Sequence, residues 1–317
     1  HDPYLSYRTA TRGAYSYLSS YTELIFFRIG VSSSTMQYDR TPNHRNASSG
    51  SKGGALLAVT QTQVDAYFMD NGLPPITGYE SNYKASGTDQ LYAPAGSSKM
   101  YYKREPRFYA DITFDGQKWL NTTNGVVYTN LQYSGNAGRK EGLNDYTKTG
   151  YIIRKCAPEG NWNTEDRVGI LMRLPVIYFD YIEALCELEI LRGNSIPASS
   201  DIWYYLNLIR ERAGIPQYKA GQITPPTDPQ KVKELIIAEK RVDLSFENAR
   251  FFDVRRWGIA KETQGKAIYG MDIEKDGSDF YIRTKVEDRT FTDRQYFFPI
   301  PQGEIDIDKN LEQNPGY

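Results

Sequence analysis

The second half of the chain repeats apolar residues at helical spacing. Between Arg173 and Gly193 they form two stripes, in which apolar positions recur every three or four residues. One stripe holds Leu174, Ile177, Tyr181, Leu185 and Leu188, and the other holds Phe179, Ile182, Cys186 and Ile190. Two stripes predict a helix that is covered on two sides. Pro175 suits its first turn and Gly193 suits its end.

Three further helices follow the same rules. The first begins at a Ser200 cap and stops at Gly214, and the second begins with Asp228 as cap and Pro229 at the first helical position. A last helix is predicted over 248–258. Together they make two helical hairpins. Their spacing differs from the roughly 34-residue period of tetratricopeptide repeats, so the pattern alone predicts hairpins and no named repeat.

The first half has a different pattern. Up to about Asp166 it is rich in Gly, Ser, Asn, Thr and Tyr, with few long periodic runs, which predicts short strands and long loops. The strand candidates are 24–29 and 110–114, and 60–70 reads as one short helix. The predicted fold class is therefore mainly α, with a loop-rich region over 1–166 and a helical-hairpin region over 167–317 that together form one unit.

Glu239 lies in the middle of an apolar stripe. Its helical neighbours are Val232, Leu235, Val242 and Phe246. Because an unpaired carboxylate in a core costs several kcal/mol, we expect a cation beside it. The expected partners are Arg250, Arg255 or Arg256 on the following segment.

Glu239, Asp243 and Glu247 recur at every fourth position of one helix face. Such a ladder can hold a metal or supply an acid and a base. Carboxylate metal sites in helical bundles usually add a His three residues further on, which is missing here, whereas arginines are close in sequence. We therefore predict structural ion pairs and no metal, cofactor or catalytic residue. The predicted members are Glu239, Arg241, Glu247, Arg250, Asp253 and Arg256.

Composition excludes several function classes. Thirty-eight basic and 39 acidic residues give a net charge of −1, which argues against a nucleic-acid or anionic-membrane surface as the main partner. The longest apolar stretch, 169–190, is interrupted by charges and predicts no membrane span. Two cysteines are too few for a disulfide framework, and Cys186 is predicted to be a buried thiol. His44, in a polar loop, is a poor candidate for a catalytic base.

Four ordered blocks of the sequence resemble the SusD/RagB family of Bacteroidetes outer-membrane nutrient-binding lipoproteins. They are REPRFY at 104–109, RLPVIYFDYIEAL at 173–185, EKRVDLSFENARFFDVRRW at 239–257, and the FFPIP and NPGY segments near the end. Glu105, Lys240 and Asn248 depart from the residues that are usual in the family, without removing the pattern.

The resemblance implies a SusD-like fold with tetratricopeptide-like hairpins and a non-catalytic protein. It implies a lipid anchor that this chain lacks, a place on the extracellular face of the outer membrane, and a SusC-like TonB-dependent transporter as partner. The captured nutrient is an oligosaccharide or, in the RagB branch, a peptide. The resemblance also implies that an N-terminal repeat region is absent from this chain, and that Tyr317 is a true end.

Tyrosine is over-represented, with 26 residues, and its ring suits stacking on a sugar face. The candidate stacking rings stand in polar, loop-like surroundings, and they are Tyr79, Tyr83, Tyr92, Trp119 and Trp162. Packing without a ligand is the competing role for each. Two further function classes remain open: a protein-interaction scaffold that binds no small molecule, and a glycosidase, which needs two facing carboxylates that no part of the sequence singles out.

The arginines of the 104–107 block also allow two roles. They can clamp an anionic substrate or tie a loop down through backbone carbonyls and a local carboxylate such as Asp111. The second role is the commoner use of such a block, and we predict it here.

Overall fold

The computed structural model describes residues 2–14, 18–19, 22–31, 34–45, 52–75, 93, 97–119, 127–140, 144–157, 162 and 167–317. The α-helices there are α1 (Pro3–Thr11), α2 (Ser34–Arg40), α3 (Gln61–Val64), α4 (Pro106–Asp111), α5 (Leu174–Arg192), α6 (Asp201–Ala213), α7 (Pro229–Asp243), α8 (Ala249–Arg256), α9 (Ala260–Gln264) and α10 (Gln302–Ile307). The 3-10 helices are η3 (Lys99–Tyr101), η4 (Gly277–Tyr281) and η5 (Asp293–Tyr296).

Within the described residues, four two-stranded antiparallel sheets accompany the helices. The strands are β1 (Leu24–Val31), β2 (Ile112–Thr113), β3 (Lys118–Trp119), β4 (Val127–Tyr128), β5 (Ile152–Ile153), β6 (Arg167–Arg173), β7 (Ile268–Met271) and β8 (Arg283–Glu287). They pair as β1–β6, β2–β5, β3–β4 and β7–β8. Most are short, so helices dominate the architecture, as the hydrophobic pattern predicts.

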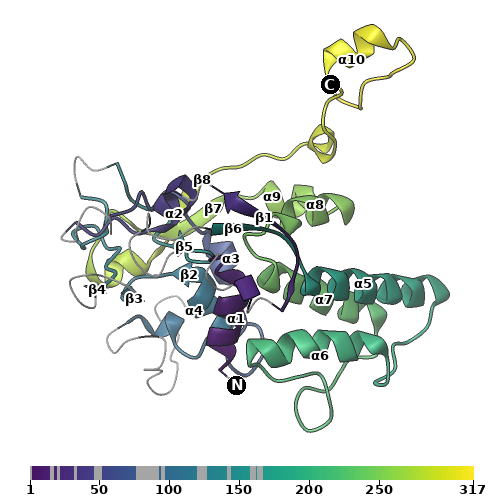
Figure 1. The fold of residues 1–317 in the computed structure, drawn as a ribbon, viewed down its shortest axis with the longest axis horizontal. Coiled ribbons are helices and arrows are strands. Elements are labelled where there is room, and N and C mark those ends of the chain that lie inside the picture. The colour runs from purple at the N-terminus through teal and green to yellow at the C-terminus, as the bar shows by residue number, and fades with distance from the viewer. Residues whose placement is uncertain are drawn as a thin grey trace.

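The predicted hairpin helices form where local signals place them. Ser200 and Asp228 cap α6 and α7 through their side chains, and Gly193 and Gly214 end α5 and α6 in the left-handed conformation, with φ of 68° and 72°. Helix α5 packs against both α6 and α7, and Figure 1 shows the three side by side. These predictions are confirmed.

Helix α5 is buried along one stripe. Phe179, Ile182 and Cys186 lie in a core shared with α6 and α7, which confirms Cys186 as a buried thiol. Ile177 and Tyr181 of the other stripe are exposed. The expectation of cover on two sides is therefore wrong for this structure, because α6 and α7 both pack on the side of the first group.

The loop-rich half departs further from its local pattern. The strand expected over 24–29 exists as β1, but the strand expected over 110–114 is reduced to β2 because Pro106 starts helix α4 just before it. The helix expected over 60–70 ends after one turn, at Val64. Helices α1 and α2 carry no strong periodic signal and were not predicted.

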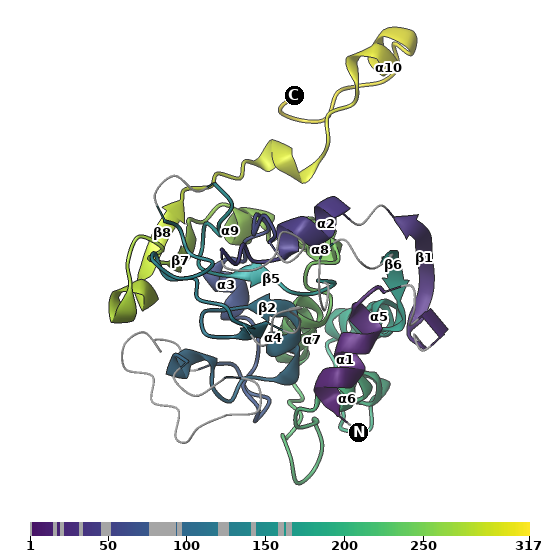
Figure 2. The same cartoon turned by 60° about the vertical axis from the view of Figure 1, so that its left-hand side comes forward.

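The main hydrophobic core joins both halves of the chain. Aromatic rings of the first half, such as Tyr101, Phe108 and Phe114, share it with Val242 of α7 and Phe280 of η4. Helix α1 contacts α4 and α6. The chain on either side of residue 166 therefore packs as one body, with α4 and α7 near its centre (Figure 2).

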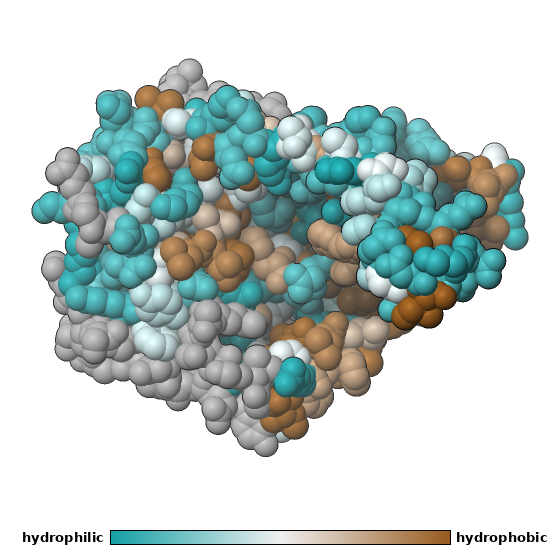
Figure 3. Space-filling view, turned by 90° about the horizontal axis from the view of Figure 1, so that it is seen from above, coloured by the Kyte–Doolittle hydropathy of each residue, from teal (hydrophilic) through white to brown (hydrophobic). Residues whose placement is uncertain are grey.

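The chain after β8 leaves this body as an arm that carries η5 and α10 (Figures 1 and 2). Phe298 and Ile307 on the arm are 67% and 84% exposed. Seen from the side toward which the arm projects, the surface is mostly hydrophilic, with separate hydrophobic patches (Figure 3). No helix among the described residues is both long and apolar enough to cross a membrane.

Candidate functional site

Glu239 is the centre of a buried charged cluster. Its side chain is 1% exposed and accepts from Arg107 Nη2 at 2.5 Å and Arg210 Nη1 at 2.7 Å. Arg107 belongs to α4 and Arg210 to α6. The cations expected from the following segment are thus the wrong ones, because helices from elsewhere in the chain pack against this face of α7.

Asp243 lies one turn further along α7 and is fully buried. It forms ion pairs with Arg107, Arg173 and Arg212. Burial by itself raises the pKa of Asp243, but Arg212, Arg173 and Arg107 together hold it well below its ordinary value. Asp243 is therefore ionised at neutral pH and fastens three elements to α7.

Glu247 extends the cluster beyond the end of α7. It pairs with Arg173 at 2.7 Å and with Lys155 at 2.5 Å. Burial opposes its ionisation, yet Arg173 and Lys155 lower the pKa of Glu247. The three acids of the ladder thus each meet a cation. Among the residues described, no group of three or more His, Cys, Asp or Glu side chains could hold a metal ion.

The 104–107 block ties this cluster to the loop-rich half. Arg104 donates to the carbonyls of Val64 at 2.5 Å and Tyr67 at 3.0 Å, and Glu105 accepts from the Phe68 amide at 2.7 Å and from Arg107 Nε at 2.6 Å. Burial raises the pKa of Glu105 to about 7, against the opposing charge of Arg107. The block binds loops in the way we predict.

Asp111 has a different role from the one expected. It is not the partner of the 104–107 arginines and instead accepts from the hydroxyls of Tyr7, Tyr67 and Ser245, at 2.9 to 3.0 Å. Its Oδ2 also lies 4.0 Å from Lys155 Nζ. It therefore connects α1 and the loop-rich half to the segment after α7.

A second ionic network lies on a neighbouring face of α7. Lys240 pairs with Asp180 and Asp253, each at 3.2 Å, while Arg256 pairs with Glu183 and with Asp253. Arg241 and Arg250, also expected in ion pairs, form none within the described part of the chain. Arg241 instead donates to Gln63 Oε1 and the Thr62 carbonyl.

The predicted stacking rings are placed as follows. Tyr79, Tyr83 and Tyr92 lie outside the described residues. Trp119 is 3% exposed and packs edge-on against His44, so in this structure it presents little surface for stacking on a sugar. Trp162 is half-buried and packs edge-on against Tyr38, at 5.2 Å between ring centroids.

His44 lies in the interior of the protein. It is buried, its Nε2 lies 3.1 Å from Thr129 Oγ1, and burial lowers its pKa to about 4. The ring therefore stays neutral at physiological pH. The buried carboxylates of the α7 cluster are held by cations or hydroxyl donors, so they offer no acid and base facing each other across an open cleft.

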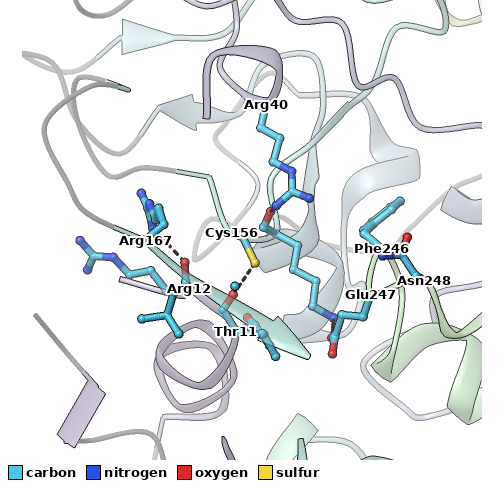
Figure 4. Close-up of a pocket in the computed structure, with 12 residues that line it drawn as sticks. Thr11, Arg12, Arg40, Cys156, Arg167, Phe246, Glu247 and Asn248 are labelled. Carbon is cyan, nitrogen blue, oxygen red and sulfur yellow. Dashed lines mark hydrogen bonds and ion pairs between the residues drawn. The ribbon is translucent and has the colours of Figure 1, made fainter. Parts of the chain in front are cut away.

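A small enclosed pocket borders the cluster. Its volume is about 130 Å³, and it lies between the end of α1, β6 and the α7–α8 connection. Figure 4 shows Arg12 and Arg167 together on one side, Glu247 and Asn248 on the other, and the Cys156 thiol donating to the Thr11 carbonyl at 2.8 Å. Oligosaccharide sites need several hundred Å³, so this pocket is too small to be one.

Comparison with known proteins identifies this architecture. The model of the SusD family matches residues 22–317. The chain belongs to the SusD family. It resembles the crystal structure of a SusD-like protein from Bacteroides fragilis, with 28% identity, a TM-score of 0.74 and coverage of 98% of this chain and 57% of that one.

Two other relatives agree on the fold or the family. A SusD-like carbohydrate-binding protein from B. fragilis gives a TM-score of 0.60 at 21% identity, over 96% of this chain and 57% of that one. SusD-like protein P2 of Formosa agariphila is 26% identical over 151 residues, which is 47% of this chain and 26% of that protein. The chain spans just over half the length of the solved relatives and about a quarter of the curated one.

The family match confirms the predicted family and the mainly helical SusD-like fold. SusD family proteins are non-catalytic surface lipoproteins of the outer membrane that bind glycans and work with SusC-type transporters. Sequence reasoning found the α7 acids from their place in an apolar stripe. It missed Arg107, Arg210 and Arg212 as their partners, since nothing in the local pattern connects α4 or α6 to α7.

Proposed function

We propose that this protein captures an oligosaccharide at the cell surface, without catalysis, and hands it to a SusC-type TonB-dependent transporter. The observation that carries the proposal is the family match over residues 22–317. A SusD-like carbohydrate-binding protein from B. fragilis shares the fold. In such a role the protein is attached to the extracellular face of the outer membrane through a lipid.

The described interior supports a binding role over an enzymatic one. The acids of the α7 cluster neutralise buried arginines, and His44 is buried and stays neutral at physiological pH. A capturing subunit needs modest affinity and fast release, because a tightly held ligand is not passed on.

Two assays on the same panel of polysaccharides distinguish a binding protein from an enzyme. Affinity electrophoresis through gels that contain each polysaccharide is expected to retard the protein on at least one of them, with bovine serum albumin as the control for nonspecific retardation. Incubation with the same panel is expected to yield no new reducing ends. New reducing ends would identify an enzyme, and retardation on none would favour a peptide-binding subunit or a protein-interaction scaffold.

Transport partnership is tested in membranes. We expect an affinity-tagged chain to co-purify with a SusC-type transporter from detergent extracts of cells that produce both. Protease added to intact cells should degrade the lipid-anchored protein, while a periplasmic marker protein survives. Protection of both proteins from the protease would place this protein on the periplasmic side of the outer membrane and contradict the proposal.

A further inference from the structure

A larger cleft lies outside the buried cluster, between α8, α9 and the residues around the end of β8. We call it the α8–α9 cleft. Its volume of about 550 Å³ falls within the range of about 300 to 1,000 Å³ that is usual for small-molecule sites. Its walls include Arg250, Phe251, Arg255, Gln264, Glu287 and Arg289. All of these lie in the fully described segment 167–317.

Arg250 carries positive charge that the protein leaves poorly matched. Its side chain is half-buried, and the buried Nη1 has no hydrogen-bond partner among the described residues. Burial lowers the pKa of Arg250, with Asp253 as the opposing charge. Burial, and to a smaller extent the nearby charge of Arg250, lowers the pKa of Arg241 to about 10. An anion bound beside Arg250 would relieve this repulsion.

Arg255 is fixed as part of the same wall. Its guanidinium donates to the carbonyls of Phe251 at 2.8 Å and Gln295 at 3.1 Å, and its centre lies 3.7 Å from the Phe251 ring centroid and 5.3 Å from that of Phe291. Since these contacts exist without ligand, the wall needs little ordering when a ligand binds.

Arg289 lines the cleft from the segment after β8. Its Nε donates to the Lys266 carbonyl at 3.3 Å and its Nη1 to Gln264 Oε1 at 3.2 Å. The cleft therefore has positioned cations on two sides, one from α8 and one from the segment after β8. Such an arrangement suits a carboxylate or sulfate group, which forms charge-assisted hydrogen bonds with guanidinium groups.

The acids of the cleft favour a sugar over a bare inorganic anion. Glu287 and Asp288 line it as well, and Asp288 is held by Lys285 at 2.8 Å. Carboxylates accept hydrogen bonds from sugar hydroxyls, which a bare phosphate or sulfate does not carry. The rings of Phe251 and Phe291 add apolar surface that suits the C–H face of a pyranose.

We propose that the α8–α9 cleft binds an acidic oligosaccharide, one that carries uronate or sulfate ester groups, with Arg250 and Arg289 recognising the anionic group. The inference rests on the proposed function as a glycan-capturing protein and narrows its ligand class. The predicted rings Trp119 and Trp162 are not among the residues that line this cleft.

The test compares charged and neutral forms of the same sugar. Isothermal titration calorimetry on the full chain would use oligogalacturonate and its carboxyl-reduced form, and sulfated and unsulfated dextran oligosaccharides. We expect the wild type to bind at least one acidic form ten times or more tighter than its neutral counterpart. Sodium acetate and sodium sulfate serve as the free-anion arm and should bind at least tenfold more weakly.

The variants locate the preference. Arg250→Gln and Arg289→Gln are each expected to reduce the acidic-to-neutral ratio at least fivefold. The matched control is Lys219→Gln, which removes an exposed positive charge from the loop after α6 and should keep the ratio. Melting curves verify folding; if Arg250→Gln does not fold, Arg289→Gln on the segment after β8 carries the test.

The possible failures differ in meaning. Equal affinity for acidic and neutral forms, or a preference that survives both arginine substitutions, overturns the assignment of the cleft and leaves glycan capture standing. Free sulfate or acetate binding as tightly as the acidic sugar overturns the sugar assignment. No binding of any oligosaccharide in the retardation panel and the titrations would contradict the proposed function itself.

Discussion

The two faces of α7 carry ionic networks that differ in burial. One face presents Glu239 and Asp243, whose side chains are at most 1% exposed, to arginines from α4 and α6 and to Arg173 just before α5. The other presents Lys240 to acids of α5 and α8, and ends at Arg256, whose side chain is 52% exposed. The comparison shows that one helix can hold a fully buried ion-pair network on one face and a partly hydrated network on the neighbouring face.

The difference is one of energetics and of what is joined. We call the buried ion pairs of Glu239 and Asp243 with their arginines the dry network. Water cannot replace a lost partner there, so removing one charge leaves another uncompensated, at a cost of roughly 3–5 kcal/mol. Exposed pairs contribute about 0–1 kcal/mol and weaken with salt. The dry network joins the loop-rich half to the hairpins, whereas the hydrated one joins three neighbouring helices of the second half.

The largest effect is expected from Asp243→Asn. This change leaves Arg107, Arg173 and Arg212 around a neutral amide, and we expect a loss of about 4 kcal/mol in the free energy of unfolding. Urea denaturation followed by circular dichroism measures it. Glu234→Gln, an exposed acid on the same helix, is the matched control and should change stability by less than about 0.5 kcal/mol. Equal losses for the two variants would show that the buried ion pairs of Asp243 stabilise the fold no more than an exposed acid does.

Glu239→Gln is expected to cost somewhat less, about 3 kcal/mol, because the amide oxygen can still accept from Arg107 or Arg210. The melting temperature should fall while oligosaccharide affinity stays nearly unchanged. Calorimetric titration at a temperature where the variant is folded separates the two. Lost binding without lost stability would reverse the structural assignment and make Glu239 a ligand-binding residue.

Glu105 gives the dry network a pH dependence of its own. Its folded pKa of about 7 exceeds the ordinary 4.5, so the folded state keeps a proton that the unfolded state releases. This contribution to stability is complete below about pH 4.5 and is lost as pH rises through about 7. At about 1.4 kcal/mol per pKa unit, the decline is up to about 3 kcal/mol.

Glu105→Gln should remove that decline. Urea titrations at steps between pH 5 and pH 8 are expected to show wild-type stability falling relative to the variant as pH rises. Asp243 and Glu247 do not interfere, because their pKa values are lowered and they stay ionised across this window. Parallel curves for the two proteins would mean that Glu105 is ionised throughout, as an ordinary partner of Arg107.

The smallest effect is expected on the hydrated face. Arg256→Gln removes two ion pairs, with Glu183 and Asp253, whose arginine is half exposed, and we expect a loss of less than about 1 kcal/mol that disappears in 1 M salt. The comparison partner is Asp243→Asn, whose loss should persist at the same salt concentration. A loss above about 2 kcal/mol for Arg256→Gln would remove the distinction between the two faces.

Local signals were sufficient for the bounds of helices α5, α6 and α7. Ser200, Asp228, Gly193 and Gly214 act through neighbours within one turn, so caps and helix ends could be predicted from the sequence. The loop-rich half was less predictable. The strand expected over 110–114 shrank because the helix started by Pro106 packs against α1, which is a contact between distant segments.

The candidate site divides in the same way. Glu239 could be predicted to need a cation, because a charge at a buried helical position must be neutralised wherever the chain folds. Arg107 and Arg210 could not be chosen over Arg250, Arg255 or Arg256, because proximity in sequence says little about which helices meet. The location of the Arg250 guanidinium in an open cleft likewise depends on the packing of α8 beside α9 and the segment after β8, which the sequence does not reveal. The local hydrophobic pattern predicts which side chains are buried, whereas the identity of an ion-pair partner depends on contacts between segments far apart in the chain.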